Sequence, residues 1–163
     1  MKLEAIKIEK STESSLLKTE AKIYKLLENT KGVPSLRSYG CEGNFNYMVM
    51  DLLGRSLEEV RVACGGKIGL KSVLAIGIQL LKRIEAIHEE GIIHRDIKPD
   101  NFLLKPQSNM IYIIDFGLAR RYKTKKEQHI TLTDGRKLTG TARYASANAV
   151  SYTHLTLPTR AQV

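Results

Sequence analysis

The side chains best suited to chemistry lie in one stretch of the second half of the sequence. Asp96 and Asp115 supply carboxylates, Asn101 supplies an amide, and Lys98 supplies a cation. Carboxylate and amide oxygens are ligands that a hard cation such as magnesium prefers. A carboxylate can also accept a proton from a hydroxyl group, and a lysine can neutralise phosphate oxygens. These residue types could therefore hold a metal-bound phosphate group beside a hydroxyl that attacks it.

The order of these residues carries a family resemblance. His94-Arg95-Asp96-Ile97-Lys98-Pro99-Asp100-Asn101 resembles the catalytic loop of protein kinases, and Asp115-Phe116-Gly117 resembles the metal-binding triplet that follows it. Upstream, Glu4-Ala5-Ile6-Lys7 looks like the strand that carries the ATP-contacting lysine, and Glu20 stands where the ion-pair partner of that lysine stands. The triplet alone is weak evidence, whereas four groups in the family's order predict kinase ancestry.

The resemblance implies a role for each residue. Asp96 would orient the acceptor hydroxyl and accept its proton, and Lys98 would reach the transferred phosphate. The cofactors would be ATP and Mg2+. The remaining expected contacts are Asn101 and Asp115 to two magnesium ions, Lys7 to the inner phosphates of ATP, and Glu20 to Lys7. The alternative for these residues is structural: a surface lysine, and buried acid and amide side chains that serve turns and caps.

A narrower resemblance is to casein kinase I. The run Leu138–Ser146, LTGTARYAS, is similar to that family, with Ser-x-Asn in place of the Ala-Pro-Glu of most kinases. Other similar stretches are Glu20–Tyr24, Met48–Leu57, Lys98–Leu103 and Tyr112–Ala119. The resemblance covers about residues 3–148. The tau-tubulin and vaccinia-related kinases share part of it.

The same resemblance implies an adenine pocket. Met50 would guard its back, and the backbone of Asp51 and Leu53 would offer hydrogen bonds to adenine. Leu103 and Ile114 would form the floor. Taken without the resemblance, Met50 reads equally well as a strand residue that packs in the core.

The substrates implied are acidic or already phosphorylated proteins, and a basic stretch fits them. Eight Lys or Arg residues lie between Arg120 and Arg143, opposed only by Glu127 and Asp134, so the stretch holds +6 of the chain's net charge of +9. The resemblance points to Arg143, with Lys137, as the phosphate contact, and a guanidinium can bind phosphate through two hydrogen bonds.

Two other readings of the basic stretch stay open. The first is a solvated loop, because exposed charge often has no partner. The second is a nucleic-acid surface, but only Tyr122 and Tyr144 interleave with the cations, so no nucleic-acid partner is expected.

The periodicity of apolar residues predicts an α+β, protein-kinase-like two-lobed fold that is partial. The small lobe spans residues 1–53 and the large lobe spans residues 54–148. Alternation predicts strands, and apolar residues three and four apart predict helices. The predicted elements are a strand over 2–9, a helix over 16–29, strands over 33–41 and 44–52, helices over 56–64 and 71–90, and strands over 102–104 and 110–114.

Composition fits one ordinary globular domain, with 42% hydrophobic and 26% charged residues in 163. No apolar run reaches the length of a signal peptide or a membrane span. We therefore expect an intracellular protein, in the cytoplasm or nucleus, that is monomeric. Cys41 and Cys64 have no paired spacing, so we expect buried thiols rather than a disulfide or metal site.

The sequence departs from the family at both ends. Six residues precede Lys7, and no Gly-x-Gly-x-x-Gly occurs in the chain. The resemblance ends after Asn148, so we expect residues 149–163 to be a non-family tail, either artefactual or a divergent terminus. We therefore expect a domain truncated at both ends, weak or inactive by itself, with uncovered apolar faces on the helix over 71–90. A related alternative is a pseudokinase or binding module without turnover.

Overall fold

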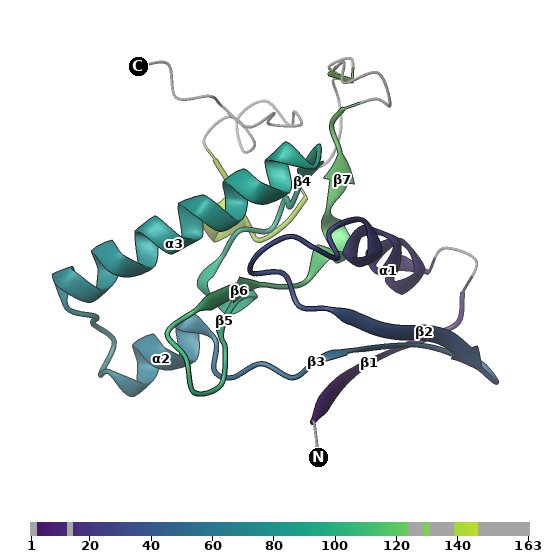
Figure 1. Cartoon of the computed structure of the whole chain (residues 1–163), viewed down its shortest axis with the longest axis horizontal. Helices are drawn as coiled ribbons and strands as arrows, with labels where there is room; N and C mark the ends of the chain where they lie inside the picture. Colours follow the sequence, from purple (N-terminus) through teal and green to yellow (C-terminus); the bar gives the residue numbers. More distant parts are fainter. Residues whose placement is uncertain (1–2, 13–14, 124–128, 131–138, 147–163) are drawn as a thin grey trace.

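The computed structural model describes residues 3–12, 15–123, 129–130 and 139–146. It has an antiparallel sheet with one helix at the N-terminal side and a helix-rich part with two strand pairs at the C-terminal side (Figure 1). The α+β fold class expected from the sequence is confirmed.

The N-terminal sheet contains β1 (Glu4–Lys10), β2 (Leu36–Glu42) and β3 (Phe45–Asp51) in the order β1-β3-β2. Helix α1 (Leu16–Leu26) packs against β2 and β3. In the register of β1 and β3, Lys7 lies opposite the buried Met48. The side chain of Lys7 thus starts from a backbone position that the sheet fixes.

The start of α1 is tied to β1 by a carboxylate. Ser15 caps the helix by accepting the Lys18 N–H at 3.2 Å. Glu9 accepts the Ser15 hydroxyl at 2.6 Å and the Leu17 N–H at 3.1 Å. The hydrogen bond from Ser15 comes first among the causes that lower the pKa of Glu9. The first turn of α1 is therefore anchored to the strand that carries Lys7.

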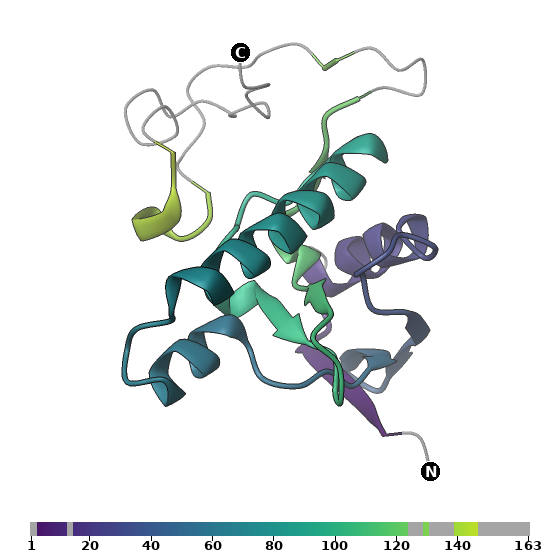
Figure 2. The ribbon, with the colours of Figure 1, turned by 60° about the vertical axis from the view of Figure 1, so that its left-hand side comes forward.

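The C-terminal part begins with α2, whose N-terminus has a capping box between Ser56 and Glu59. A long helix, α3, follows it, and the β5–β6 hairpin lies between α3 and the N-terminal sheet (Figure 2). The elements are α2 (Leu57–Ala63), α3 (Leu70–Glu89), β4 (Ile92–Ile93), β5 (Phe102–Leu104), β6 (Ile111–Ile113), β7 (Arg120–Arg121), and 3-10 turns at Pro99–Asn101, Phe116–Leu118 and Ala142–Tyr144.

A small antiparallel pair joins the two ends of the chemistry-bearing stretch. Strand β4 pairs with β7, so the segment before His94 lies beside the segment after Asp115. Arg95 strengthens this link because its Nε donates to the Leu118 carbonyl at 2.6 Å. The sequence analysis did not predict β4 or β7, because two residues are too few to show a period.

The connection between the two parts lies along β5. The Gly54 N–H donates to the Leu104 carbonyl at 2.7 Å, and the Leu104 N–H donates to the Arg55 carbonyl at 2.9 Å. A Cβ at Gly54 would lie 3.0 Å from that Leu104 oxygen. This connecting segment around Gly54 and Arg55, the linker, is therefore held against the β5–β6 hairpin that leads to Asp115.

Helix α3 is less buried than its sequence suggests. Apolar residues recur at helical spacing along it, a pattern typical of a core helix, but only Ile87 among them is buried, and Leu74 and Leu81 are 60% and 70% exposed. Ile76, Leu80 and Ile84 are partly buried against the core. An apolar face on this helix is thus uncovered within the described residues.

The two cysteine side chains lie at the surface of the structure. The expectation that Cys41 and Cys64 are buried is wrong, since both thiols are exposed. Cys41 lies near the tip of the β2–β3 hairpin and Cys64 just after α2, where no other described element covers them. Within the described ranges, no helix is both long and apolar enough to cross a membrane.

Candidate active site

One lysine joins the two parts of the molecule. Lys7 Nζ donates to Glu20 Oε2 at 2.8 Å and to Asp115 Oδ1 at 2.9 Å. Burial alone would lower the pKa of Lys7, but hydrogen bonds and charge from the two carboxylates outweigh it and raise that pKa. The ammonium group therefore stays protonated between a helix residue and a residue that begins a 3-10 turn.

Glu20 is held in an apolar environment, with its side chain 2% exposed. Burial raises the pKa of Glu20, and the hydrogen bond and charge of Lys7 oppose that rise. Its second oxygen, Oε1, is buried without a hydrogen-bond partner among the described residues. The nearby Phe116 N–H lowers the pKa of Glu20 but makes no well-aligned hydrogen bond with Oε1. The positive charge of Lys7 therefore offsets the cost of burying the Glu20 carboxylate.

The position of Asp115 is fixed by its backbone. Its φ angle is 66°, a left-handed conformation that is uncommon for a residue other than glycine. The Asp115 N–H donates to the buried Tyr24 hydroxyl at 3.1 Å. The next residue, Phe116, is fully buried and its ring meets the Tyr24 ring edge-on at 5.0 Å. Helix α1 therefore positions both Glu20 and, through Tyr24, the backbone of Asp115.

Asp96 lies in the loop after β4, and both its carboxylate oxygens are engaged. Oδ1 accepts the Thr141 N–H at 2.9 Å and the Thr141 hydroxyl at 2.7 Å. Oδ2 lies 2.9 Å from Lys98 Nζ. Burial would raise the pKa of Asp96, but the hydrogen bonds from Lys98 and Thr141 outweigh it and lower that pKa. Asp96 is accordingly a carboxylate that can accept a hydrogen bond from a hydroxyl.

Lys98 and Thr141 form a chain of hydrogen bonds that ends on Asp96. Lys98 Nζ donates to Thr141 Oγ1 at 3.0 Å, and that hydroxyl donates to Asp96 Oδ1. Hydrogen bonding to Asp96 is the first cause that raises the pKa of Lys98. Gly140 permits this approach, because its φ is +92° and a Cβ there would lie 2.2 Å from the Arg95 carbonyl oxygen.

Asn101 is buried directly beneath the same carboxylate. Its Nδ2 donates to the Asp96 carbonyl at 2.8 Å and to Asp96 Oδ2 at 3.2 Å. Its carbonyl accepts the Ile114 N–H at 3.0 Å, which places Asn101 beside the residue that precedes Asp115. Because Nδ2 faces Asp96, the remaining amide oxygen is the group that could bind a cation.

The donor set fits magnesium in chemical type. Asn101 supplies an amide oxygen, and Asp115 a carboxylate that is 43% exposed at its side chain. Within the described ranges, no group of three or more His, Cys, Asp or Glu side chains could hold a metal ion by itself. Oxygens from a bound ligand would therefore have to complete the coordination, as phosphate oxygens do.

His94 supports the loop from below and is 1% exposed. Its Nδ1 accepts the Asp96 N–H at 3.3 Å, so the other nitrogen, Nε2, carries the proton and donates to the Ile114 carbonyl at 2.9 Å. The His94 ring also packs against Phe116 at 5.0 Å. Burial lowers the pKa of His94, which keeps the ring neutral between the two halves of the site.

The residues expected around adenine come from the linker and its flanking strands. Met50 lies opposite Ala5 in the β1–β3 pair, and Leu103 forms an isolated bridge with Ser56. Ile114 follows β6 and is partly buried. Met50 and Leu103 therefore lie beside the linker, and the adenine pocket itself stays a prediction.

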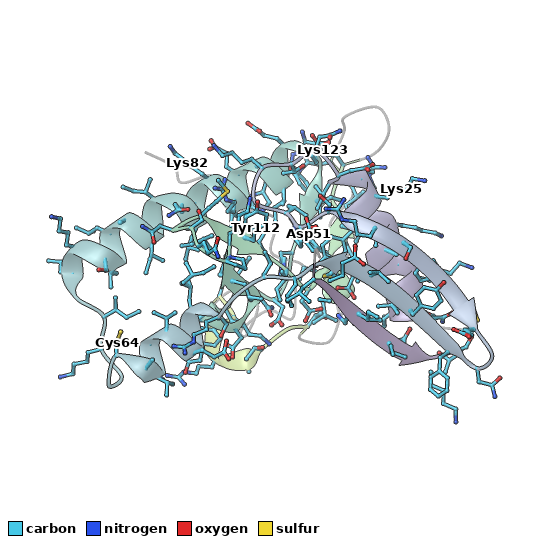
Figure 3. All side chains as sticks on the ribbon, turned by 60° about the horizontal axis from the view of Figure 1, so that its bottom comes forward. Lys25, Asp51, Cys64, Lys82, Tyr112 and Lys123 are labelled. Atoms are coloured by element: carbon cyan, nitrogen blue, oxygen red, sulfur yellow. The ribbon has the colours of Figure 1, made fainter. Side chains whose placement is uncertain are left out.

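At the linker itself, Asp51 and Leu53 have different backbone roles. The Asp51 N–H donates to the Ser35 carbonyl at 3.3 Å, and its carboxylate binds Arg37 and the Ser35 N–H. The Leu53 N–H makes no hydrogen bond within the described part of the chain. Figure 3 labels Asp51 near the centre of the molecule.

The expected substrate-phosphate residues are only partly described. Arg143 is exposed in the 3-10 turn after Thr141, and its guanidinium lies 5.6 Å from the centre of the Tyr144 ring. The charge of Arg143 is also one cause that lowers the pKa of Glu58, after the larger effect of Arg61. Lys137 lies outside the described residues.

Three residues with a place in this site were given no role by the sequence analysis. They are Thr141, which binds Asp96; His94, which supports the loop; and Tyr24, which holds Asp115. All three belong to stretches that carry the family resemblance, so their types were visible. Their contacts span 20 to 91 positions or depend on burial, and a single sequence shows neither.

Comparison with protein-family models matches residues 1–159 of this chain to the family described as the protein kinase domain. The match therefore includes most of residues 149–163, which were expected to have no family counterpart and which lie outside the described residues.

Proposed function

The chain belongs to the protein kinase domain family, and from that premise we propose that it is a serine/threonine kinase of casein kinase I type. It would transfer the γ-phosphoryl group of ATP to Ser or Thr side chains of proteins. The observation that carries the proposal is the pair of linked clusters. Lys7 joins Glu20 to Asp115, and Asp96 joins Lys98 to Asn101.

Phosphoryl transfer needs positioning and charge neutralisation more than covalent help from the protein. ATP with magnesium ions would supply the phosphoryl group and the compensating positive charge, with Asn101 and Asp115 as the protein ligands. Lys7 would exchange its contact with Asp115 for the inner phosphates and keep its contact with Glu20. Its raised pKa ensures that it does so as a cation.

At the other cluster, Asp96 would hold the acceptor hydroxyl. Its lowered pKa keeps it ionised at neutral pH, and Lys98 lies 2.9 Å from it, where it can contact the phosphate in transfer. The hydroxyl of Thr141 already occupies one acceptor position on Oδ1. A substrate hydroxyl would therefore bind beside it or replace it.

The test is the rate of phosphoryl transfer to a Ser-containing acidic peptide, with enzyme in excess over labelled ATP because we expect this chain to be a weak catalyst. Asp96→Ala should lower the rate by at least several hundredfold, since orientation and proton acceptance are each worth orders of magnitude. The matched control is Asp100→Ala, an exposed carboxylate in the same loop. A normal rate in Asp96→Ala would refute the role given to Asp96, and ATP binding without any transfer would favour the pseudokinase reading.

The preference for acidic or phosphoprimed substrates rests on Arg143 and Lys137. Loss of one charge-assisted pair should cost about 1.5–3 kcal/mol, or roughly ten- to a hundredfold in kcat/KM. Arg143→Ala should therefore lower kcat/KM for a phosphoprimed peptide and spare its unphosphorylated twin. An equal loss for both peptides would show that Arg143 instead stabilises the fold of its own segment, through its contact with the Tyr144 ring or its attraction to Glu58.

A further inference from the structure

A groove lies between α1 and β2, on the side of α1 away from Glu20. Its volume is about 490 Å³. Ala21 and Leu36 contribute apolar surface to it, and the partly exposed ring of Tyr39 lies at its side. None of these residues takes part in the candidate active site.

The helix wall of this groove is strongly basic. Lys18, Lys22 and Lys25 line it, and their spacing places them on one face of α1. All three are exposed, and no ion pair or hydrogen bond engages their ammonium groups within the described residues. Figure 3 shows Lys25 projecting outward from α1. The one acid that lines the groove is Glu28, beyond the end of the helix.

This arrangement is unfavourable for α1 on its own. Like charges four residues apart destabilise a helix, and a cation in the first turn opposes the helix dipole. Lys18 lies in that first turn, which has no acidic residue. A negatively charged ligand along the wall would remove this repulsion, and the apolar surface would bind a side chain that a simple counter-ion lacks.

We propose that the α1–β2 groove docks an acidic segment of a partner protein that carries an apolar or aromatic side chain. Its carboxylates lie along Lys18, Lys22 and Lys25, and its apolar side chain packs on Ala21, Leu36 and Tyr39. Strand β2 pairs only with β3 among the described strands, so its outer edge also offers peptide groups to an extended segment. A peptide is favoured over a nucleic acid because the floor of the groove is apolar, which suits the side chain of a peptide rather than a phosphate backbone.

This surface does not include Arg143, and its use needs no phosphoryl transfer. The inference therefore does not depend on the proposed function. A failure of peptide docking leaves the kinase assay unaffected, and an inactive enzyme leaves the docking measurement valid.

The experiment measures binding of a fluorescein-labelled peptide of alternating Glu and Phe to the full chain by anisotropy. We expect salt-sensitive binding, tighter than that of a polyglutamate peptide of equal charge. A triple variant reverses the charge of the helix wall: Lys18→Glu, Lys22→Glu and Lys25→Glu. It should bind the Glu-Phe peptide at least about tenfold more weakly, because three attractive contacts become repulsive. If that variant does not fold, the corresponding change of all three lysines to Gln should still weaken binding about threefold or more.

The matched control reverses Lys67, Lys71 and Lys82, three exposed lysines on or before α3 that change the net charge equally. Figure 3 shows Lys82 on α3, away from Lys25. Binding within twofold of wild type supports the groove. An equal loss in both triple variants, no binding of the Glu-Phe peptide, or tighter binding of a single-stranded oligonucleotide of equal charge would each overturn the proposal.

Discussion

Asp96 is engaged on both oxygens before any substrate is present, and Thr141 accounts for two of its contacts. The Thr141 backbone N–H donates a hydrogen bond to Oδ1. The Thr141 hydroxyl donates to the same oxygen while it accepts a hydrogen bond from the Lys98 ammonium group. The residue therefore does more than fill space in the run after Gly140. It sets the direction and the basicity of the carboxylate.

Thr141→Val should lower the single-turnover rate of phosphoryl transfer by about tenfold or more, because a hydrogen bond to a charged group contributes about 1.5–3 kcal/mol. The variant keeps the side-chain volume and the backbone N–H but removes the hydroxyl that bridges Lys98 and Asp96, which leaves only their direct contact at 2.9 Å. The acidic limb of the pH–rate profile should also move to higher pH, since one group that lowers the pKa of Asp96 is lost.

Thr141→Ser is the matched control, because it keeps the hydroxyl and loses only a methyl group. Its rate should stay within about threefold of wild type. If Val and Ser were equally slow, the methyl group rather than the hydrogen-bond chain would matter, and the positioning role of Thr141 would be wrong.

Residue types were predictable at this scale, but contacts were not. The motif order gave Lys7, Glu20, Asp96, Asn101 and Asp115, and the structure brings them into two clusters. Nothing in the sequence says that Thr141 faces Asp96 across 45 positions, because the approach depends on the backbone conformation of Gly140. A glycine in a sequence indicates a close backbone approach only once the segment packed against it, here the Arg95 carbonyl, is known.

At the scale of elements, the turn between α1 and β2 holds the N-terminal part against α3. The Gly32 carbonyl accepts the Ile113 N–H at 2.8 Å. Directly over Gly32 lies the buried side chain of Arg83, whose Nε donates to the Ile111 carbonyl at 2.9 Å. This contact is one place where the sheet, the β5–β6 hairpin and α3 all meet.

Gly32→Ala should destabilise the protein by about 2 kcal/mol or more. Its φ of +86° is strained for alanine, at about 1–2 kcal/mol, and the new Cβ would lie 2.0 Å from Arg83 Nε. Gly43→Ala is the control, because its φ is +54° but no atom of the described residues lies within 4 Å of a new Cβ. Urea unfolding should show a larger loss for Gly32→Ala, and equal losses would mean that backbone strain alone acts.

Element positions followed from periodicity within a few residues wherever elements were long. The strand predicted over 44–52 spans Phe45–Asp51 in the structure, and the helix predicted over 71–90 spans Leu70–Glu89. The failures were of two kinds. Strands β4 and β7 exist only because each pairs with the other, and the burial of α3 depends on neighbours that a periodic pattern does not identify.

On the scale of the whole molecule, the site joins parts that are far apart in sequence, and His94 lies at their junction. Its ring contacts Phe116, accepts the Asp96 N–H and donates to Ile114. The contact with the Asp96 N–H requires a neutral ring whose proton lies on Nε2. Protonation of Nδ1 would end its contact with the Asp96 N–H and place a charge in a buried site.

The stability of the whole fold should therefore depend on pH through this histidine. Burial lowers the pKa of His94 in the folded state from its ordinary value of 6.5. Between the lowered pKa and 6.5 the unfolded chain binds more protons, so stability falls as pH is lowered through that window. The effect is about 1.4 kcal/mol for each unit by which the pKa differs. His88 acts in the same direction, because burial lowers its pKa too.

Other groups have different windows or signs, so a single variant must isolate the effect. Asp96 has a lowered pKa and contributes stability that is lost only in more acidic solution, whereas the raised pKa of Glu20 acts in the opposite sense to His94. His94→Gln retains a donor for the Ile114 carbonyl but cannot titrate. The free energy of unfolding, measured in urea at pH 7.5 and pH 5.5, should fall less in this variant than in wild type. Ile93→Val, a neighbouring change that removes a methyl group and no ionisable group, should keep the wild-type difference, and the same difference in His94→Gln would show that His94 is not the residue that titrates.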